Sequence, residues 1–315
     1  GPPGPPARRA AISLRSIPAE KALSPAPACG WVNVQWTNTY NFPGANLHDV
    51  GRAVAVDSSG NVVIGGYYTV ATGDEDIWIT KYDSNGGWLW NVNYWGGAGK
   101  SDVASGMAVD AAGEIYTAGS MDENHLGQRQ NAWVSRHASG GGVFLWDDRY
   151  NSPANSSDVA RAIAVDGAGS VYATGYEVRT DLGQSYNVWV RKYASNGLEQ
   201  WTTTYNSPYN SLDAGYGIAV DPSGNVYVAG SQYRGDLFQG YNSWIRKYTA
   251  AGSALWTASY NSSANSDDEI SAIAVDGGGN AYVAGYSYRG YLGQSYNSLI
   301  QKYDTNGNLL WTRTY

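Results

Sequence analysis

The feature of this sequence that most constrains its fold is a 15-residue stretch, cleanest at residues 272–286, that recurs five times along the chain. Small and β-branched residues at 272–275 are followed by Asp-Gly-Gly-Gly-Asn and then by an alternating Ala-Tyr-Val-Ala run. Asp, Asn and Gly accept the backbone angles of a tight reversal, and the alternation is typical of a half-buried strand. Each copy therefore predicts a β-hairpin.

The spacing between the aspartates that end the first strand of each hairpin gives the period of the repeat. These residues are Asp57, Asp110, Asp166, Asp221 and Asp276, so the steps between them are 53, 56, 55 and 55 residues. A period near 55 residues that holds four strands is typical of a propeller blade. Helical solenoids have shorter repeats with a 3.6-residue periodicity, and the chain shows neither.

Two further strand patterns complete each period. The third strand resembles Ser-Trp-Ile-Arg-Lys-Tyr at 243–248. The fourth ends in Trp-x-x-x-Tyr, and this pattern occurs six times, at 36–40, 90–94, 146–150, 201–205, 256–260 and 311–315. Six copies of the fourth strand therefore accompany five hairpins.

These patterns predict an all-β fold, a five-bladed β-propeller of four-stranded blades over residues 31–315. We expect an extra outer strand at 31–40 and then five blades that end near residues 94, 150, 205, 260 and 315. Residues 1–30 are rich in Pro and Ala and predict a flexible or polyproline arm or linker. An arm that docks on a neighbouring subunit is the alternative.

Composition excludes several partners. The net charge of −7 argues against nucleic acid, because phosphate binding needs clustered Lys and Arg. No apolar run is long enough to cross a membrane, so we expect no membrane insertion. The single cysteine, Cys29, cannot form an internal disulfide.

At this point the repeat resembles a known family. The pattern Ile-Ala-Val-Asp-x-x-Gly-Asn-Val-Tyr-Val-Ala-Gly, with Lys-Tyr-Asp-x-Asn-Gly-Asn-Leu-Leu-Trp at 302–311, is similar to the secreted bacterial β-propeller repeats called SBBP repeats. The resemblance covers about residues 40–315. It implies an extracellular or cell-surface protein with a structural or adhesive role, and no chemistry. The family name implies seven blades, whereas this sequence supplies five.

A second aspartate recurs eight residues before each hairpin aspartate. Carboxylates in such a ring could bind a hard cation, and calcium is the metal ion that we consider here. The alternative is that these carboxylates accept backbone N–H groups where each blade begins. The five residues are Asp49, Asp102, Asp158, Asp213 and Asp268.

The loops between the second and third strands carry aligned aromatic, amide and guanidinium groups. Such groups suit the binding of sugar rings, and one site per blade would give avidity. The alternative is that they only order long loops. The glycan-binding candidates are Arg179, Gln184, Tyr186, Asn187, Arg234, Gln239, Tyr241, Asn242, Arg289, Gln294, Tyr296 and Asn297.

We expect no enzymatic activity. The three histidines, His48, His125 and His137, fall at unrelated repeat positions, and no nucleophile or metalloprotease motif is present. A glycoside hydrolase would need two acids on different blades, whereas the acids here recur as equivalent sets. We therefore predict a non-enzymatic scaffold, with a multivalent lectin as the alternative and a hydrolase as the less favoured one.

The surplus outer strand predicts self-association. An aromatic strand with unpaired backbone groups can add to another subunit, and a head-to-tail contact of this kind gives a fibre unless it closes. The alternative is that the surplus strand becomes a fifth strand of one blade. The residues expected to act are Trp31, Trp36, Tyr40, Trp311 and Tyr315.

Overall fold

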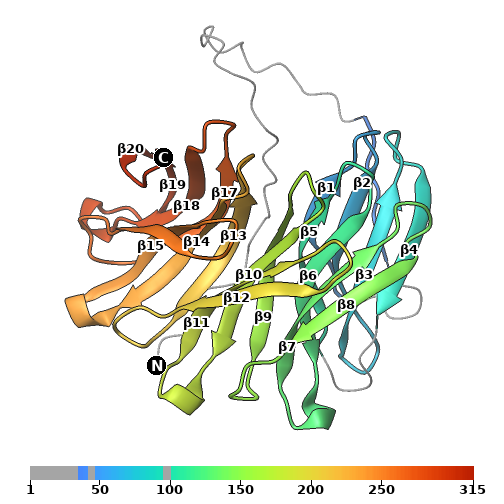
Figure 1. Ribbon diagram of the computed structural model, residues 1–315, viewed down its shortest axis with the longest axis horizontal. Coiled ribbons are helices and arrows are strands. Elements are labelled where there is room, and N and C mark those ends of the chain that lie inside the picture. Colours follow the sequence, from blue (N-terminus) through green and yellow to red (C-terminus); the bar gives the residue numbers. More distant parts are fainter. Residues whose placement is uncertain (1–34, 42–46, 95–100) are drawn as a thin grey trace, which may run out of the picture.

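The computed structural model describes residues 35–41, 47–94 and 101–315. These residues form five antiparallel sheets of four strands, each in sequence order from the inside outwards. Figure 1 shows the sheets following one another along the chain as the blades of a propeller. The predicted fold is confirmed. The expectations for residues 1–30 and Trp31 lie outside the described residues.

Each blade contains four consecutive strands. Blade 1 is β1 (Asp49–Val56), β2 (Val62–Thr69), β3 (Glu75–Tyr82) and β4 (Trp88–Tyr94); blade 2 is β5 (Val103–Val109), β6 (Ile115–Asp122), β7 (Gln130–His137) and β8 (Phe144–Tyr150). Blade 3 is β9 (Asp158–Val165), β10 (Val171–Val178), β11 (Tyr186–Tyr193) and β12 (Glu199–Tyr205); blade 4 is β13 (Asp213–Val220), β14 (Val226–Arg234), β15 (Gln239–Tyr248) and β16 (Ala254–Tyr260). Blade 5 is β17 (Asp268–Val275), β18 (Ala281–Tyr288), β19 (Tyr296–Tyr303) and β20 (Leu309–Thr314). One-turn 3-10 helices precede the third strands of blades 2 to 5, namely η1 (Asn124–Leu126), η2 (Thr180–Leu182), η3 (Gly235–Leu237) and η4 (Gly290–Leu292).

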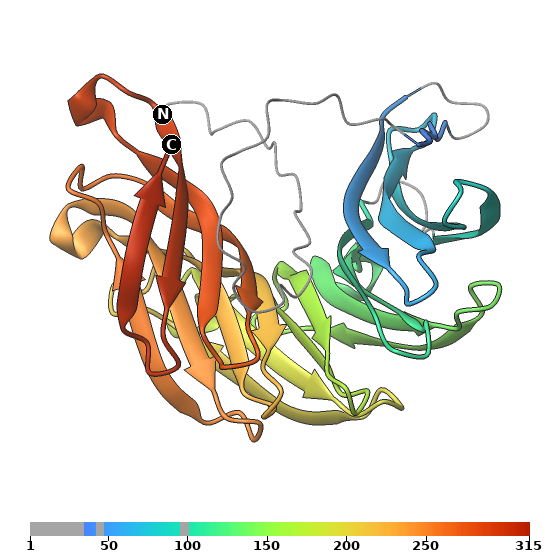
Figure 2. The same ribbon diagram turned by 90° about the horizontal axis from the view of Figure 1, so that it is seen from above.

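The hydrophobic core is divided among the joints between blades. Four buried clusters of Tyr, Trp, Val, Ile and Ala fill the joints from blade 1–blade 2 to blade 4–blade 5. The innermost strands contact one another in the same order. Among the described residues, no pair of strands from blades 1 and 5 makes comparable contact, and Figure 2 shows these two blades standing apart. The propeller is therefore an open arc, because four similar joints do not bring its first and last blades together.

Every innermost strand contains a β-bulge. The pairing with the second strand shifts by one residue, which leaves one extra residue unpaired in each inner strand: Arg52, Ser105, Arg161, Tyr216 and Ser271. A bulge changes the direction of the side chain that it carries. Four of the five, all but Arg52, line a cavity at the centre of the arc.

A glycine of the second strand faces each bulge. A Cβ atom on these glycines would lie 1.8–2.0 Å from a carbonyl oxygen of the inner strand. Such a distance excludes any side chain unless the backbone moves. This contact explains why glycine ends the Val-Ala-Gly part of the motif, at Gly66, Gly119, Gly175, Gly230 and Gly285.

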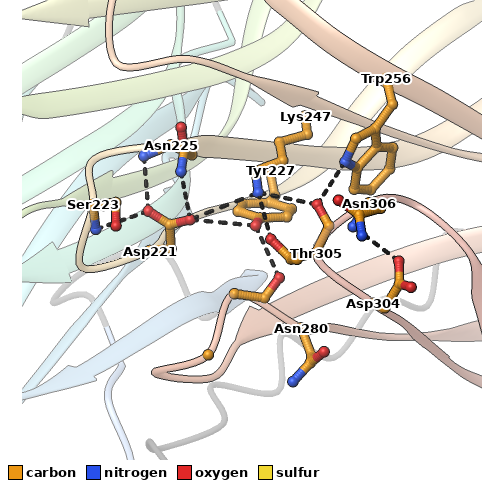
Figure 3. A network of polar contacts seen from close by, with 12 residues as sticks. Asp221, Ser223, Asn225, Tyr227, Lys247, Trp256, Asn280, Asp304, Thr305 and Asn306 are labelled. Atoms are coloured by element: carbon orange, nitrogen blue, oxygen red, sulfur yellow. Dashed lines mark hydrogen bonds and ion pairs between the residues drawn. The ribbon is translucent and has the colours of Figure 1, made fainter.

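The hairpin aspartates hold the inner turns. One carboxylate oxygen of Asp221 accepts the backbone N–H groups of Ser223 and Asn225, both at 2.9 Å. The other accepts the Asn225 side-chain amide at 2.8 Å and the Tyr227 hydroxyl at 3.3 Å (Figure 3). All five aspartates make the two backbone bonds. Their role is therefore to close the turn.

Replacing Asp221 by alanine is expected to lower the free energy of unfolding by about 2 kcal/mol, because hydrogen bonds to a buried charged group are lost. Urea denaturation followed by tryptophan fluorescence measures the change. Ser223→Ala is the control: Ser223 contributes its backbone N–H to this turn, so the variant should unfold within about 0.5 kcal/mol of the wild type. Equal effects of the two substitutions would contradict the assigned role.

Candidate functional site

The joints between blades share one polar contact. In blades 1 to 4, the Trp of the outer strand donates its indole N–H to a carbonyl in the turn between the third and fourth strands of the next blade. The distances are 3.4 Å from Trp90 to Ser139, 3.1 Å from Trp146 to Ser195, 3.1 Å from Trp201 to Ala250 and 3.0 Å from Trp256 to Thr305. Figure 3 shows the last of these. We call the Trp and Tyr of the outer strand the anchor, and the turn of the next blade the receiving turn.

The receiving turn requires glycine for two reasons. Gly142, Gly197, Gly252 and Gly307 all have positive φ, between 67° and 87°. A Cβ atom on each would also lie 2.7–2.8 Å from the anchoring indole ring. In the first three joints, the Tyr of the anchor packs beside it on a buried Trp of the next blade, as Tyr205 does on Trp244 at 4.8 Å between ring centroids. The anchor and receiving turn thus form a specific, repeated interface.

Residues 36–40 occupy the receiving turn of blade 1. Trp36 donates to the carbonyl of Ser84 at 3.2 Å, and Tyr40 stacks on Trp78 with ring centroids 4.7 Å apart. Asn38 adds a hydrogen bond to the carbonyl of Gly86 at 2.8 Å. Residues 35–41 lie in no sheet, so the described part of the predicted extra outer strand, residues 36–40, does not pair as a strand. Residues 31–34 of that prediction lie outside the described residues. In the last blade, beside which this segment could close the ring, the third strand β19 is already paired with β20.

The anchor of blade 5 has no receiving turn among the described residues. The Trp311 ring packs on Tyr282 and Arg313 of its own blade. No hydrogen bond from its indole is present in the part of the chain that the structure describes. Tyr315 is 78% exposed. The two ends of the arc therefore differ, because residues 36–40 cover the receiving turn of blade 1, whereas the blade 5 anchor fills no receiving turn among the described residues.

The loop residues predicted to bind glycans mostly contact one another. In blades 3 to 5 the Asn side-chain amide donates to the Gln side chain at 2.7–2.9 Å, in the pairs Asn187–Gln184, Asn242–Gln239 and Asn297–Gln294. Arg179 and Arg234 form ion pairs with Asp181 and Asp236. Arg289 precedes η4 at the equivalent position. These contacts favour the interpretation that the residues order the loops.

The loop tyrosines lie in aromatic pairs. Tyr186 stacks on Tyr176 with centroids 4.6 Å apart, whereas Tyr241 and Tyr296 make edge contacts with Tyr233 and Tyr288. Tyr296 is 53% exposed. A glycan site at each blade stays a prediction.

The five aspartates predicted as a cation ring stand where the inner strands begin, but the structure does not gather them. Asp158, Asp213 and Asp268 accept the backbone N–H of Ser152, Ser207 and Ser262 at 2.5–2.6 Å, and Asp102 accepts that of Asp122 at 2.8 Å. Asp49 begins β1 and is half-buried. No three His, Cys, Asp or Glu side chains come together as a metal site within the described ranges. These bonds favour the alternative in blades 3 to 5, where the carboxylate ties the blade to the loop that enters it, and a calcium site at these aspartates stays a prediction.

Burial changes the acidity of these aspartates. It raises the pKa of Asp158 to about 7, with the nearby Glu177 carboxylate adding to the effect, and the pKa of Asp213 to about 6. The pKa of Asp268 is also raised by burial. Just below neutral pH, Asp158 and Asp213 are therefore protonated more often in the folded chain than in the unfolded chain.

A cavity of about 200 Å³ lies between the innermost strands. The bulge residues Ser105, Arg161, Tyr216 and Ser271 line it, together with small and aliphatic residues such as Ala162 and Ile273. The sequence interpretation missed this site. A signal was present in the sequence. The bulge is the fourth residue of each inner strand, counted from the blade-entry aspartate, and it reads Arg, Ser, Arg, Tyr, Ser among mostly small and aliphatic residues.

Comparison with known proteins finds one matching family model and two similar solved structures of low identity. The SBBP β-propeller repeat matches residues 200–231, which confirms the predicted resemblance. Two similar solved structures are the WD40 β-propeller domain of Doa1 (13% identity, 85% of this chain and 69% of that chain, TM-score 0.47) and BamB from Moraxella catarrhalis (11% identity, 85% and 77%, TM-score 0.37). No curated protein sequence matches. Within the residues described, no helix is long and apolar enough to span a membrane.

Proposed function

We propose that the protein is a non-enzymatic extracellular or cell-surface scaffold that assembles head to tail with copies of itself. One observation carries the proposal: the anchor Trp311–Tyr315 of blade 5 is built like four anchors that fill a receiving turn, yet it fills none in the described residues. The secreted repeats that the chain resembles support the location.

The receiving turn of blade 1 in a second copy is the natural partner. It has the carbonyl of Ser84, the positive-φ Gly86 and the Trp78 ring, which match the turns used inside the arc. In each copy this turn is covered by the chain's own Trp36 and Tyr40. Assembly is therefore an exchange, in which the blade 5 anchor of one copy displaces residues 36–40 of the next.

We expect the blade 5 anchor of a second copy to bind the receiving turn of blade 1 more strongly than residues 36–40 do. Residues 36–40 hold blade 1 through side chains alone, whereas a whole blade brings a sheet face like those that bury the clusters at the other joints. Burial of apolar area is the main favourable term in association. Because the two surfaces differ, the contact is heterologous and extends into a fibre unless the ring closes.

Sedimentation velocity over a range of concentrations, with electron microscopy, tests the proposal. The double substitution Trp311→Ala and Tyr315→Ala is expected to abolish association. The double substitution Trp36→Ala and Tyr40→Ala should strengthen association by about tenfold or more, because it uncovers the receiving turn. Trp88→Ala, at a site 62% exposed on β4, is the control and should change nothing. Association that persists in the first variant, or weakens in the second, would refute the exchange.

The lectin alternative has less support. Its polar candidates are largely bonded to one another within their loops, as Asn187 is to Gln184. Sugar binding at each blade would have to break these contacts. We therefore do not propose one glycan site per blade.

A further inference from the structure

We propose that the central cavity is a binding site for one small carboxylate-bearing sugar, a hexuronic acid, held by Arg161. The site is distinct from the blade ends used in the proposed assembly. It rests on the side chains that the inner-strand bulges bring together, on the charge of the cavity and on its size.

The residue at the inner-strand bulge differs from blade to blade. After the entry aspartate, the inner strands around the bulges consist mostly of Ala, Gly, Val and Ile, with Met107 and Glu269 as the exceptions. At the bulge, the side chain is freed from the ladder and placed in the cavity, where it is Ser105, Arg161, Tyr216 or Ser271. The bulge side chain is polar in every blade, whereas most of its neighbours in the inner strands are small or aliphatic. We infer from this contrast that the bulge side chains do more than pack the blades.

Among the described residues, Arg161 is the only charged one that lines the cavity, in a chain whose net charge is −7. Its guanidinium lies over the ring of Tyr176 at 5.4 Å, and that ring stacks on Tyr186 at 4.6 Å. The stack fixes the position of the guanidinium without neutralising its charge.

The guanidinium also lacks a carboxylate partner. Its Nε atom is buried without a hydrogen bond, and no ion pair with a carboxylate is present in the described residues. By contrast, Arg179 and Arg191 each pair with two carboxylates. The buried Glu269 of β17 does not line the cavity. Arginine presents five donors in a planar fork that matches a carboxylate, so an anionic group is the ligand that this arrangement fits.

The rest of the lining defines the remainder of the ligand. Ser105, Tyr216 and Ser271 line the cavity from three other blades and bring hydroxyl groups, and Ala162, Gly217 and Ala272 supply small apolar surface. Hydroxyls next to flat apolar surface suit the edges and face of a sugar ring. The cavity, of about 200 Å³ and partly open to solvent, has room for a single sugar ring.

Isothermal titration calorimetry with sodium glucuronate and galacturonate, with glucose as the neutral match, tests the site. We expect a one-to-one complex with a millimolar or tighter dissociation constant for a uronate, and binding of glucose at least about tenfold weaker, because glucose lacks the carboxylate. Arg161→Gln should weaken uronate binding by at least the same factor. Ser271→Leu, which fills the cavity without removing charge, should abolish it.

Arg246→Gln is the matched control. Arg246 also lies over a tyrosine, Tyr205 at 4.9 Å, and its Nε is likewise buried without an acceptor, but it does not line the cavity. This variant should bind the uronates as the wild type does. Circular dichroism melts check that each variant folds. The inference is overturned if no uronate binds the wild type, if Arg161→Gln binds equally well, or if Arg246→Gln loses as much affinity.

Discussion

Replacing Gly175 by alanine is expected to lower the free energy of unfolding by about 3 kcal/mol, because the new methyl group has no room. Its Cβ atom would lie 1.8 Å from the carbonyl oxygen of Val159 and 3.0 Å from the Cα atom of Ala160. Both are backbone atoms of β9, so relief requires the bulge at Arg161 to open. The midpoint of urea denaturation, followed by tryptophan fluorescence, measures the loss.

Gly277→Ala controls for the loss of glycine itself. This glycine lies in the β17–β18 turn, without positive φ, and a Cβ atom added to it would meet no other atom within 4 Å. The variant should unfold within about 0.5 kcal/mol of the wild type. If Gly175→Ala were as stable as Gly277→Ala, the close approach of strand and bulge would be wrong.

The wild type is expected to lose stability relative to an Asp158→Asn variant as the pH rises from 5 to 6.5, by about 1.4 kcal/mol per pH unit. An aspartate in the unfolded chain has a pKa near 4, whereas burial raises the pKa of Asp158 to about 7 in the folded protein. Between these values the folded state holds a proton that the unfolded state has released, so stability falls with rising pH. Urea denaturation at several pH values measures the slope.

The wild type must be compared with the variant because the titration of another group changes the stability of both proteins in the opposite direction. Burial lowers the pKa of His137 to about 4, so that side chain makes both proteins more stable as the pH rises toward its unfolded value. Asp276→Asn is the control: the pKa of Asp276 is lowered in the fold, so its carboxyl is ionised in both the folded and the unfolded chain in this range. Parallel curves for wild type and Asp158→Asn would show that Asp158 is not protonated as described.

The blades could be predicted from the sequence because their determinants are local. The Asp-Gly turns, the strand alternation and the period of about 55 residues all act within one repeat. Asp221 illustrates this, since its partners Ser223, Asn225 and Tyr227 are all within six residues. Counting hairpins therefore predicted the number of blades.

The relations between repeats could not be predicted in the same way. Whether the arc closes depends on the angle at each joint, which is set by packed aromatic rings such as Tyr205 and Trp244 rather than by any one repeat. The bulge at Arg161 likewise shows only when two strands are placed in register. For the aspartates at blade entry the sequence leaves two roles open, and the backbone N–H groups that four of them accept come from residues that only the fold brings near.

Because the joints between blades are alike, the gene for such a chain can change by whole repeats during evolution. A unit of about 55 residues carries an anchor on one side and a receiving turn on the other, as blade 3 does with Trp201 and Ser195. A duplicated unit inserted between two blades would meet matching surfaces at both of its faces without any new substitution. Proteins of this kind can therefore gain or lose whole blades through duplication or deletion. The number of blades can change while the anchor and the receiving turn at each joint stay the same.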